Sequence, residues 1–270
     1  MMDQYTINNE EDRRNGLHEV MQQITLAGLH RAEFFKNAAF YGGTCLRIFH
    51  NLPRFSEDMD FSLLSHDPNF TLIPYFDAVK NEFHSLGRDV TITRKEKAKQ
   101  TNVESAFLKD NTEIYSLKFN SEKKIKIKIE VDVNPPLGFE TEQKLLLQPY
   151  SFMTRCFTLP NLFAGKMHAL IFRKWQGRVK GRDWFDFEWY VKKNIPLNLA
   201  HFLARAQQFS SLEVENFTPE DFKKLLNDKI TNTNIDQVIA DVKPFVKNQQ
   251  DLNIWSTDYF IQLVDFLKFE

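Results

Sequence analysis

The spacing of apolar residues predicts helices at the start of the chain. Apolar residues recur at helical intervals over residues 11–37 and 68–86, which predicts two helices. Between them, residues 38–43 form a short apolar run that ends in two glycines. A further short helix is expected over 44–50, with Thr44 as its cap and Pro53 beyond its end. The chain therefore opens with helical elements around one short apolar segment.

Alternating polar and apolar positions predict a set of strands in the middle of the chain. The expected strands are 58–63, 89–94, 103–109, 113–119 and 124–133. The last is the clearest, because isoleucine and valine alternate with charged residues that must share one face. Those charged residues are Lys124, Lys126, Lys128, Glu130 and Asp132.

Helical spacing returns after Pro160 and continues almost to the end of the chain. Six helices are expected, at 160–174, 182–193, 198–208, 219–229, 235–243 and 256–268. This order predicts an α+β fold, in which a mixed sheet flanked by helices precedes a helical half. We place the domain boundary between residues 1–158 and residues 159–270.

Composition narrows the class of protein without identifying its function. The chain has 270 residues, of which 42% are hydrophobic and 26% are charged, so a disordered or collagen-like protein is excluded. The high count of phenylalanine, 26 against 9 glycines, predicts an aromatic-rich core. Two cysteines cannot form a disulfide framework. No apolar run is long enough for a signal or a membrane span, and we expect a cytoplasmic protein with no membrane partner.

Positive charge is concentrated in two segments although the net charge is only -1. Residues 80–128 carry 12 basic and 7 acidic side chains, and residues 160–193 carry 8 basic and 3 acidic ones. If the two segments converge, they would attract a ligand that bears phosphates. Two ordinary solvated faces are the alternative interpretation. The low net charge argues against a nonspecific nucleic-acid coat protein.

Two glycines and two aspartates have a spacing that suits phosphate and metal binding. Gly42-Gly43 precede Asp58-x-Asp60 by fourteen residues. Glycines at a helix start allow close approach of the backbone, whose N–H groups bind phosphate. Asp58 and Asp60 would point to one face of a strand and could hold Mg²⁺. Such ions stabilise both oxygens of a phosphoryl transfer. A plain turn and a solvated strand edge remain the alternative.

These residues resemble the signature of the AbiEii-type nucleotidyltransferases. That family comprises the toxins of AbiE-like abortive-infection systems, is related to the MenT toxins, and belongs to the polymerase-β-like nucleotidyltransferase superfamily. The resemblance implies that Asp58 and Asp60 are metal ligands and catalytic residues. The segments that carry it are Phe40-Tyr41-Gly42-Gly43-Thr44-Cys45-Leu46-Arg47 and Leu52-Pro53-Arg54-Phe55-Ser56-Glu57-Asp58-Met59-Asp60-Phe61.

The same resemblance implies a set of nucleotide contacts near the glycine pair. Those expected to bind the nucleotide are Gly42, Gly43, Thr44, Arg47 and Ser56. Arg47 and Arg54 both match the family pattern, either as phosphate contacts or as ion-pair partners.

The strand over 124–133 and the block 166–186 resemble two further parts of the family pattern. Glu130 is the preferred third carboxylate, as a base or metal ligand, and Asp132 could share that role. Lys166 and Arg173 are seven residues apart and so share one helix face. The resemblance implies nucleotide contacts by Lys166, Arg173 and Arg182. It makes Lys166 and Asp183 catalytic-site residues and adds Asp186 as a further candidate; a helix–helix ion-pair network is the alternative.

The resemblance implies an enzyme that transfers NMP from an NTP to an acceptor hydroxyl. The expected cofactor is Mg²⁺ or Mn²⁺, with the NTP as substrate. The acceptor is expected to be RNA, such as a tRNA 3′ end, with the basic strand face as its path. The protein would be the toxin of a type IV toxin–antitoxin system whose antitoxin is encoded separately.

Two other functions stay open at this point. One keeps the chemistry and changes the acceptor to a protein or a small molecule such as an antibiotic. The other is a pseudoenzyme that binds nucleotide or RNA without turnover. Serine hydrolase and P-loop chemistry are not supported, because Gly-x-Ser-x-Gly and Gly-Lys-Ser are absent from the sequence. The seven histidines show no metal-ligand spacing with cysteine.

Overall fold

The computed structural model describes residues 1–94, 112–119, 125–173, 179–210 and 212–270. The chain divides into two compact units, which are treated separately below. The sheet unit comprises residues 1–51, 56–137 and 141–157. The helical unit comprises residues 52–55, 138–140 and 158–270. The four residues 52–55, between two elements of the sheet unit, thus belong to the helical unit.

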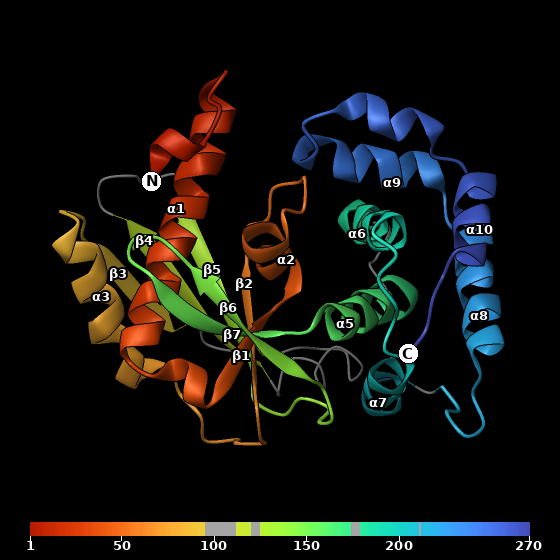
Figure 1. The fold of residues 1–270 in the computed structure, drawn as a ribbon, viewed down its shortest axis with the longest axis horizontal. Coiled ribbons are helices and arrows are strands. Elements are labelled where there is room, and N and C mark those ends of the chain that lie inside the picture. The colour runs from red at the N-terminus through yellow and green to blue at the C-terminus, as the bar shows by residue number, and fades with distance from the viewer. Residues whose placement is uncertain (95–111, 120–124, 174–178, 211) are drawn as a thin grey trace. The chain divides into compact units, whose positions relative to one another are not determined.

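A seven-stranded mixed sheet forms the centre of the sheet unit (Figure 1). The strand order is β3-β4-β5-β2-β1-β7-β6. The pairs β1/β7 and β2/β5 are parallel, and the other pairs are antiparallel. The strands are β1 (Ala38–Tyr41), β2 (Met59–Leu63), β3 (Val90–Arg94), β4 (Thr112–Phe119), β5 (Lys126–Asp132), β6 (Thr141–Leu146) and β7 (Phe152–Phe157).

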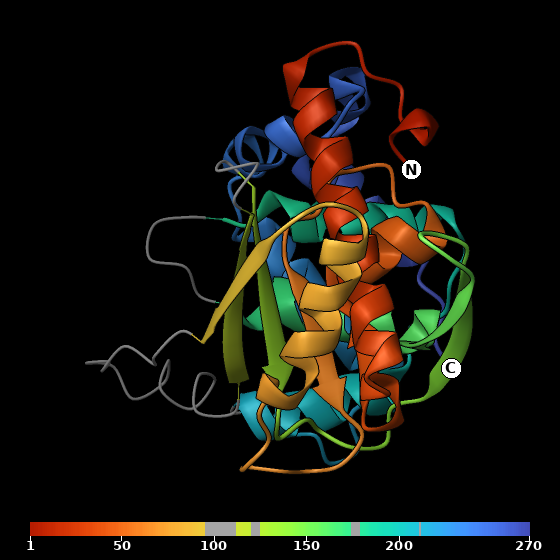
Figure 2. The same cartoon turned by 90° about the vertical axis from the view of Figure 1, so that its left-hand side faces the viewer.

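Three α-helices accompany the described part of this sheet. They are α1 (Glu10–Arg31), α2 (Gly42–His50) and α3 (Phe76–Ser85). Helix α1 contacts both β5 and β7, which lie on opposite sides of β2 and β1, so it crosses the central strands. Helices α1 and α3 lie side by side (Figure 2), because Gly28 lets the backbone of Val79 come within 2.6 Å of where a Cβ would be.

The helical unit contains six α-helices in its described residues. They are α5 (Leu159–Phe172), α6 (Gly181–Lys192), α7 (Leu199–Phe209), α8 (Pro219–Thr231), α9 (Ile235–Val242) and α10 (Thr257–Asp265). Thr218 begins α8 with a capping box to Asp221, and asparagine or serine caps α7, α9 and α10. Short 3₁₀ turns complete the chain at Met2–Gln4, Phe34–Lys36, Ile73–Tyr75, Lys243–Phe245 and Gln249–Ile254.

Phenylalanine dominates the interior of both units, as the composition predicted. Nine of the twelve largest fully buried side chains are phenylalanines. In the sheet unit Phe61 of β2 stacks on Phe40 of β1 and meets Phe34 edge to face, with centroid distances of 5.0 and 5.1 Å. In the helical unit Phe163 stacks on Tyr190 at 4.2 Å.

The α+β fold with a mixed sheet and a helical second half is confirmed, but several boundaries differ from the predictions. The first helix ends at Arg31, and a 3₁₀ turn follows at Phe34–Lys36. Helix α2 begins at Gly42, so Thr44 lies in its first turn and is not its cap. The helix predicted over 68–86 is limited to Ile73–Ser85, and the strand predicted over 103–109 lies outside the described residues.

Strand β1 was expected only as a short apolar run, and strands β6 and β7 were not predicted at all. They form an antiparallel hairpin in which Leu145 faces Met153. Strand β6 is the outer strand of the sheet, and its side chains are exposed or half-buried throughout. None of the helices in the described parts of the chain is both long and apolar enough to cross a membrane.

Candidate active site

Gly42 marks the end of β1 and the start of α2 in the sheet unit. Its φ of +81° is a left-handed conformation that favours glycine. A Cβ at this position would lie 2.3 Å from Oδ2 of Asp60. Both observations require glycine here, because any side chain would displace the Asp60 carboxylate. The predicted glycine and aspartate are therefore in direct contact.

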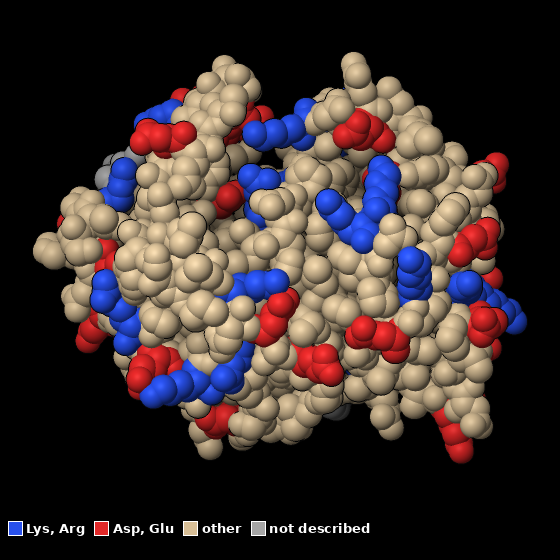
Figure 3. Space-filling view, in the orientation of Figure 1, with Lys and Arg blue, Asp and Glu red and all other residues tan. Residues whose placement is uncertain are grey.

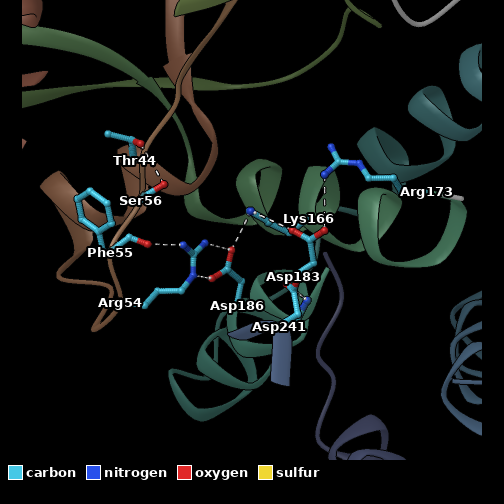
Figure 4. A network of polar contacts seen from close by, with 10 residues as sticks. Thr44, Arg54, Phe55, Ser56, Lys166, Arg173, Asp183, Asp186 and Asp241 are labelled. Carbon is cyan, nitrogen blue, oxygen red and sulfur yellow. Dashed lines mark hydrogen bonds and ion pairs between the residues drawn. The ribbon is translucent and has the colours of Figure 1, made fainter. Parts of the chain in front are cut away.

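The Thr44 hydroxyl ties the first turn of α2 to the segment that leads into β2. It is hydrogen-bonded to the Ser56 hydroxyl at 3.0 Å (Figure 4). It also donates to the carbonyl oxygen of Asp58. Thr44 and Ser56 are both buried, with exposed fractions of 0% and 7%. Two of the predicted nucleotide contacts thus use their hydroxyls to hold the backbone that carries Asp58.

Asp60 and Glu130 lie next to each other across two parallel strands. Strand β2 pairs with β5 so that Asp60 is the register partner of Glu130, while Asp132 is paired with Ser62. Neighbouring residues in such a register share a face of the sheet about 5 Å apart. Asp58, Asp60 and Glu130 are half-buried. We refer to these three residues as the carboxylate group.

Lys128 is the cation that accompanies the carboxylate group. It forms an ion pair with Glu130, two residues further along the same face of β5. Burial lowers the pKa of Lys128, but the bond to Glu130 and the charges of Glu130, Asp58 and Asp60 outweigh it and raise the pKa above the usual value. All three carboxylates therefore act on one ammonium group.

The carboxylate group fits a divalent cation in its donor chemistry. Carboxylate oxygens are the ligands that Mg²⁺ prefers, and the charges of all three carboxylates raise the pKa of the same lysine, Lys128. They are not gathered into a ready-made metal site, since no such group of three His, Cys, Asp or Glu side chains is found among the described residues. Asp58, Asp60 and Glu130 are the residues that would hold such an ion.

Two predicted residues of the sheet unit are engaged elsewhere. Asp132 is buried, and its carboxylate accepts a hydrogen bond from the backbone N–H of Asn134 at 3.1 Å, in the turn after β5. Arg47 donates to Glu19 of α1 at 2.7 Å, which is the ion-pair alternative for this residue. Glu19 also accepts a hydrogen bond from the Tyr5 hydroxyl at 2.9 Å.

Gln22 of α1 is a contact of the site that the sequence did not suggest. Its side chain is fully buried, and its amide donates to the carbonyl oxygens of Ser56 and Glu57 at 3.1 and 2.9 Å. These carbonyls immediately precede Asp58. Gln22 is one of several buried polar residues of α1, and nothing in the sequence distinguished it from the others or named its partner.

The helical unit contains a buried ion pair between Arg54 and Asp186. Arg54 binds both oxygens of Asp186, with Nε and Nη2 each 2.6 Å away (Figure 4). Their side chains are 2% and 0% exposed. Arg54 also donates to the carbonyl of Phe55 at 2.9 Å. Such planar, two-point pairing is the strong form of an arginine–carboxylate interaction.

Lys166 joins the two aspartates of α6. Its Nζ lies 2.8 Å from Oδ2 of Asp186 and 3.3 Å from Oδ1 of Asp183. Arg173, at the end of α5, is 3.7 Å from the other oxygen of Asp183. The expectation that Lys166 and Arg173 share a helix face agrees with this geometry (Figure 4). Asp183 and Asp186 lie three residues apart and bind the same lysine.

Positive charge exceeds negative charge around these aspartates. Burial raises the pKa values of Asp183 and Asp186, but nearby cations outweigh it and hold both below their usual range. The cations are Lys166, Arg173 and Lys180 for Asp183, and Arg54 and Lys166 for Asp186. We call these six residues the cation network.

Lys180, just before α6, has an unusual proton affinity. Burial, together with the charges of Arg173, Lys166 and Arg182, lowers its pKa to about 8 in spite of Asp183. The ammonium group therefore titrates close to neutral pH. In the sequence, Lys180 was only one of the 8 basic side chains of the segment 160–193.

Arg182 lies on an aromatic ring. Its guanidinium carbon is 4.1 Å from the centroid of Phe245, a cation–π contact. The preceding residue, Gly181, donates its N–H to Asp241 of α9 at 2.8 Å. These two contacts connect the start of α6 with the segment around α9.

The histidines and cysteines add no reactive group to this arrangement. His168 is buried beside Phe172 at 5.0 Å, and burial with the nearby arginines lowers its pKa to about 3. Cys45 and Cys156 are both buried, and burial raises the pKa of Cys45. Neutral imidazoles and thiols of this kind act as packing residues.

Charges on the visible surface are mixed. On the face shown in Figure 3, basic and acidic side chains are interspersed, without a broad field of one sign. Of the basic strand face predicted as an RNA path, Lys126 is exposed, Lys128 is paired with Glu130, and Lys124 lies outside the described residues. A local excess of positive charge is present in the cation network, where four cations surround two aspartates.

The fold and these residues define a nucleotidyltransferase. The profile of the AbiEii nucleotidyl transferase toxins of type IV toxin–antitoxin systems matches residues 24–262. The chain therefore belongs to the AbiEii family, and the resemblance noted in the sequence is confirmed. It is a nucleotidyltransferase toxin of the type IV class.

Solved structures of low sequence identity share the fold. MenT4, a nucleotidyltransferase toxin from Mycobacterium tuberculosis, aligns over 99% of this chain and 98% of its own, with a TM-score of 0.53 and 13% identity. JHP933 from Helicobacter pylori aligns over 93% of this chain and 88% of its own, with a TM-score of 0.51 and 20% identity. No curated protein sequence matches the chain.

Proposed function

We propose that this toxin uses a divalent metal ion to transfer NMP from an NTP to a hydroxyl of RNA, with a tRNA 3′ end as the acceptor. The observation that carries the proposal is the contact of Gly42 with Asp60, which is itself the register partner of Glu130. A helix start and two strand carboxylates meet there, which suits a phosphate and a cation. Membership in the AbiEii family supports the same chemistry.

Asp58, Asp60 and Glu130 would hold Mg²⁺ or Mn²⁺, which neutralises phosphate charge when bound. Gly42 and Gly43 present backbone at the start of α2, where helix N–H groups favour an anion. Thr44 and Ser56 keep the preceding backbone of Asp58 in place through their buried hydroxyls.

In the transfer step, one bond to the α-phosphorus forms and another breaks. The acceptor hydroxyl oxygen bonds to the α-phosphorus, and the bond from that phosphorus to the bridging oxygen of the β-phosphate breaks. Pyrophosphate leaves with the bond electrons, and Glu130 takes the proton of the acceptor hydroxyl. Lys128 beside Glu130 offsets the negative charge of the carboxylate group while the ligands assemble.

The cation network is proposed to bind the phosphates of the NTP, with Arg182 as a further contact. Lys166 and Arg173 are the residues expected to contact the nucleotide, and the helical unit would thereby complete the active site. The support is electrostatic: two carboxylates, Asp183 and Asp186, are outnumbered by the surrounding cations. A triphosphate would supply the missing negative charge. The separately encoded antitoxin is the expected partner in the cell.

The test is an incubation of the full chain with Mg²⁺, each α-³²P-labelled NTP in turn, and total RNA plus protein, resolved on a denaturing gel. Wild type should label the tRNA band. Asp58→Ala should remove the label, because Asp58 is a proposed metal ligand. Glu57→Ala is the matched control, since it deletes the exposed neighbouring carboxylate and should leave labelling intact.

The position of the label decides between acceptors. Label in a protein band would contradict the RNA acceptor and support protein nucleotidylation. A new labelled small molecule, distinct from the input NTP and its hydrolysis products, would show a small-molecule acceptor. Turnover that persists without a divalent cation, or in Asp58→Ala, would contradict the metal assignment.

A further inference from the structure

The segment 235–246 of the helical unit, which comprises α9, the following 3₁₀ turn and Val246, lies beside the cation network. Within the unit it meets two stretches of chain that carry network residues. One is the start of α6, which carries Asp183 and Asp186, and the other is the stretch 52–55, which carries Arg54. No role was predicted for this segment, because it contains none of the motifs that resemble the family.

Asp241 holds the start of α6. Its carboxylate accepts a hydrogen bond from the Gly181 N–H at 2.8 Å, and a carboxylate at a helix start is favourable for the helix dipole (Figure 4). The fit is close, since a Cβ at Gly181 would lie 2.2 Å from the carbonyl oxygen of Val238 and 2.8 Å from the N atom of Val242. The first turn of α6 therefore lies directly against α9, two residues before Asp183.

Phe245 and Val246 hold the stretch that carries Arg54. The backbone N–H of Phe55 donates to the carbonyl of Phe245 at 3.1 Å, and Arg54 forms an isolated antiparallel bridge with Val246. The ring of Phe245 lies under Arg182 at 4.1 Å. The segment 235–246 thus contacts both the backbone of Arg54 and the first turn of α6. Arg54 is also bound to α6 directly, through the side chain of Asp186.

We propose that Asp241 and Phe245 are positioning residues for nucleotide binding, and that they act by aligning Arg54 and the α6 aspartates with Lys166. This inference rests on the proposed function, in which the cation network binds the NTP phosphates. Residues that orient binding groups through hydrogen bonds typically change affinity or activity by about 10- to 100-fold when removed. Neither residue touches the substrate in this scheme.

The test compares Asp241→Ala, Asp241→Asn and Asp236→Ala in the full chain. Asp236 is an exposed carboxylate on the same helix and serves as the matched control. Asp241→Ala should speed hydrogen exchange of the first turn of α6 and raise the KM for the NTP about tenfold. Asp241→Asn keeps an oxygen acceptor and should restore KM to within about twofold of wild type. Asp236→Ala should change neither quantity.

Phe245→Leu provides an independent variant. It keeps the backbone carbonyl that Phe55 uses and removes the ring under Arg182. A KM increase of about threefold is expected, because the cation–π contact between Arg182 and the half-buried ring of Phe245 is lost. Loss of active protein with an unchanged KM in Asp241→Ala would overturn the inference, since that is the result of a purely structural role.

The two levels of the hypothesis fail in different ways. If wild type transfers nucleotide and Asp241→Ala retains its KM, the positioning role is wrong and the proposed function stands. If wild type transfers no nucleotide, the proposed function is wrong and so is a role in NTP binding. Faster exchange in Asp241→Ala would then show that the contact is purely structural.

Discussion

The sheet unit and the helical unit carry polar groups of opposite charge balance. In the sheet unit, three half-exposed carboxylates act on one lysine, Lys128. In the helical unit, two buried aspartates are surrounded by Arg54, Lys166, Arg173 and Lys180. The first arrangement has negative charge in excess, and the second has positive charge in excess.

This difference separates groups that recruit a ligand from groups that also hold the fold together. The carboxylate group lies on and just before the paired inner strands β2 and β5, where half-buried carboxylate oxygens suit a cation. The pair Arg54–Asp186 is almost fully buried, so its charges must satisfy each other. Substitutions should therefore affect mainly activity in the sheet unit and stability together with activity in the helical unit.

The largest expected effect tests the first half of this comparison. Asp60→Asn should lower nucleotide transfer on the order of a thousandfold, because a charged group at the reacting centre is lost without a change of shape. Its free energy of unfolding should change by less than about 1 kcal/mol, since the loss relieves repulsion from Asp58 and Glu130. Transfer rates and urea unfolding measure the two quantities. Activity within tenfold of wild type would contradict the assignment.

The next prediction tests the second half. Asp186→Ala should lower the free energy of unfolding of the helical unit by about 3–5 kcal/mol, because Arg54 is left buried without its carboxylate. All four tryptophans lie in residues 158–270, so tryptophan fluorescence in urea reports on this unit. Asp228→Ala, on α8, is the control for loss of one aspartate. A loss below about 1 kcal/mol would show that the pair does not stabilise the unit.

A smaller effect is expected from the support behind the carboxylate group. Gln22→Leu removes the two hydrogen bonds to the carbonyls of Ser56 and Glu57, at a cost of about 1–3 kcal/mol per unsatisfied buried group. Displacement of Asp58 should lower transfer about tenfold and raise the Mg²⁺ concentration needed for half-maximal activity.

Gln23→Leu is the matched control for Gln22→Leu. Gln23 is also buried, but its amide bonds the Tyr5 hydroxyl at 3.2 Å and does not contact the segment before Asp58. It should alter stability and leave the Mg²⁺ requirement unchanged. Equal Mg²⁺ curves for both variants would mean that Gln22 does not position Asp58.

Local periodicity explains which parts of the fold could be predicted from the sequence. Helices α6–α10 and strands β2 and β5 have clear repeats of 3.6 or 2 residues, and they formed close to their predicted positions. The β6–β7 hairpin was missed because β6, as an outer strand, has no consistently buried face. The start of α2 was misplaced because Gly42 was interpreted as a stop, whereas its φ of +81° turns the chain into the helix.

The same limit applies to the candidate site. Pairs that are close in sequence, such as Lys166 with Arg173 or Asp183 with Asp186, follow from helical spacing. Partners that are far apart do not: Arg54 and Asp186 are separated by 132 residues, and Gly181 and Asp241 by 60. Such contacts depend on which elements pack together, and single-sequence patterns contain no information on that.

The smallest expected effect concerns Lys180, whose pKa of about 8 distinguishes the cation network from the carboxylate group. As pH rises through about 8, Lys180 loses its charge, and affinity for the NTP should fall by a few fold. Folding stability should move in the opposite direction. The folded lysine binds protons less readily than the unfolded one, so its penalty is present below pH 8 and is relieved as pH rises towards 10.5.

Lys180→Arg should remove both pH effects, because arginine keeps its charge throughout this range. The measurement is NTP titration and urea unfolding of the two proteins at pH 7, 8 and 9. Lys193→Arg controls for the same exchange at an exposed position. If wild type and Lys180→Arg lose affinity equally between pH 7 and 9, another group is responsible. The contrast between the two units would then rest on charge excess alone, without a lysine that titrates near neutral pH.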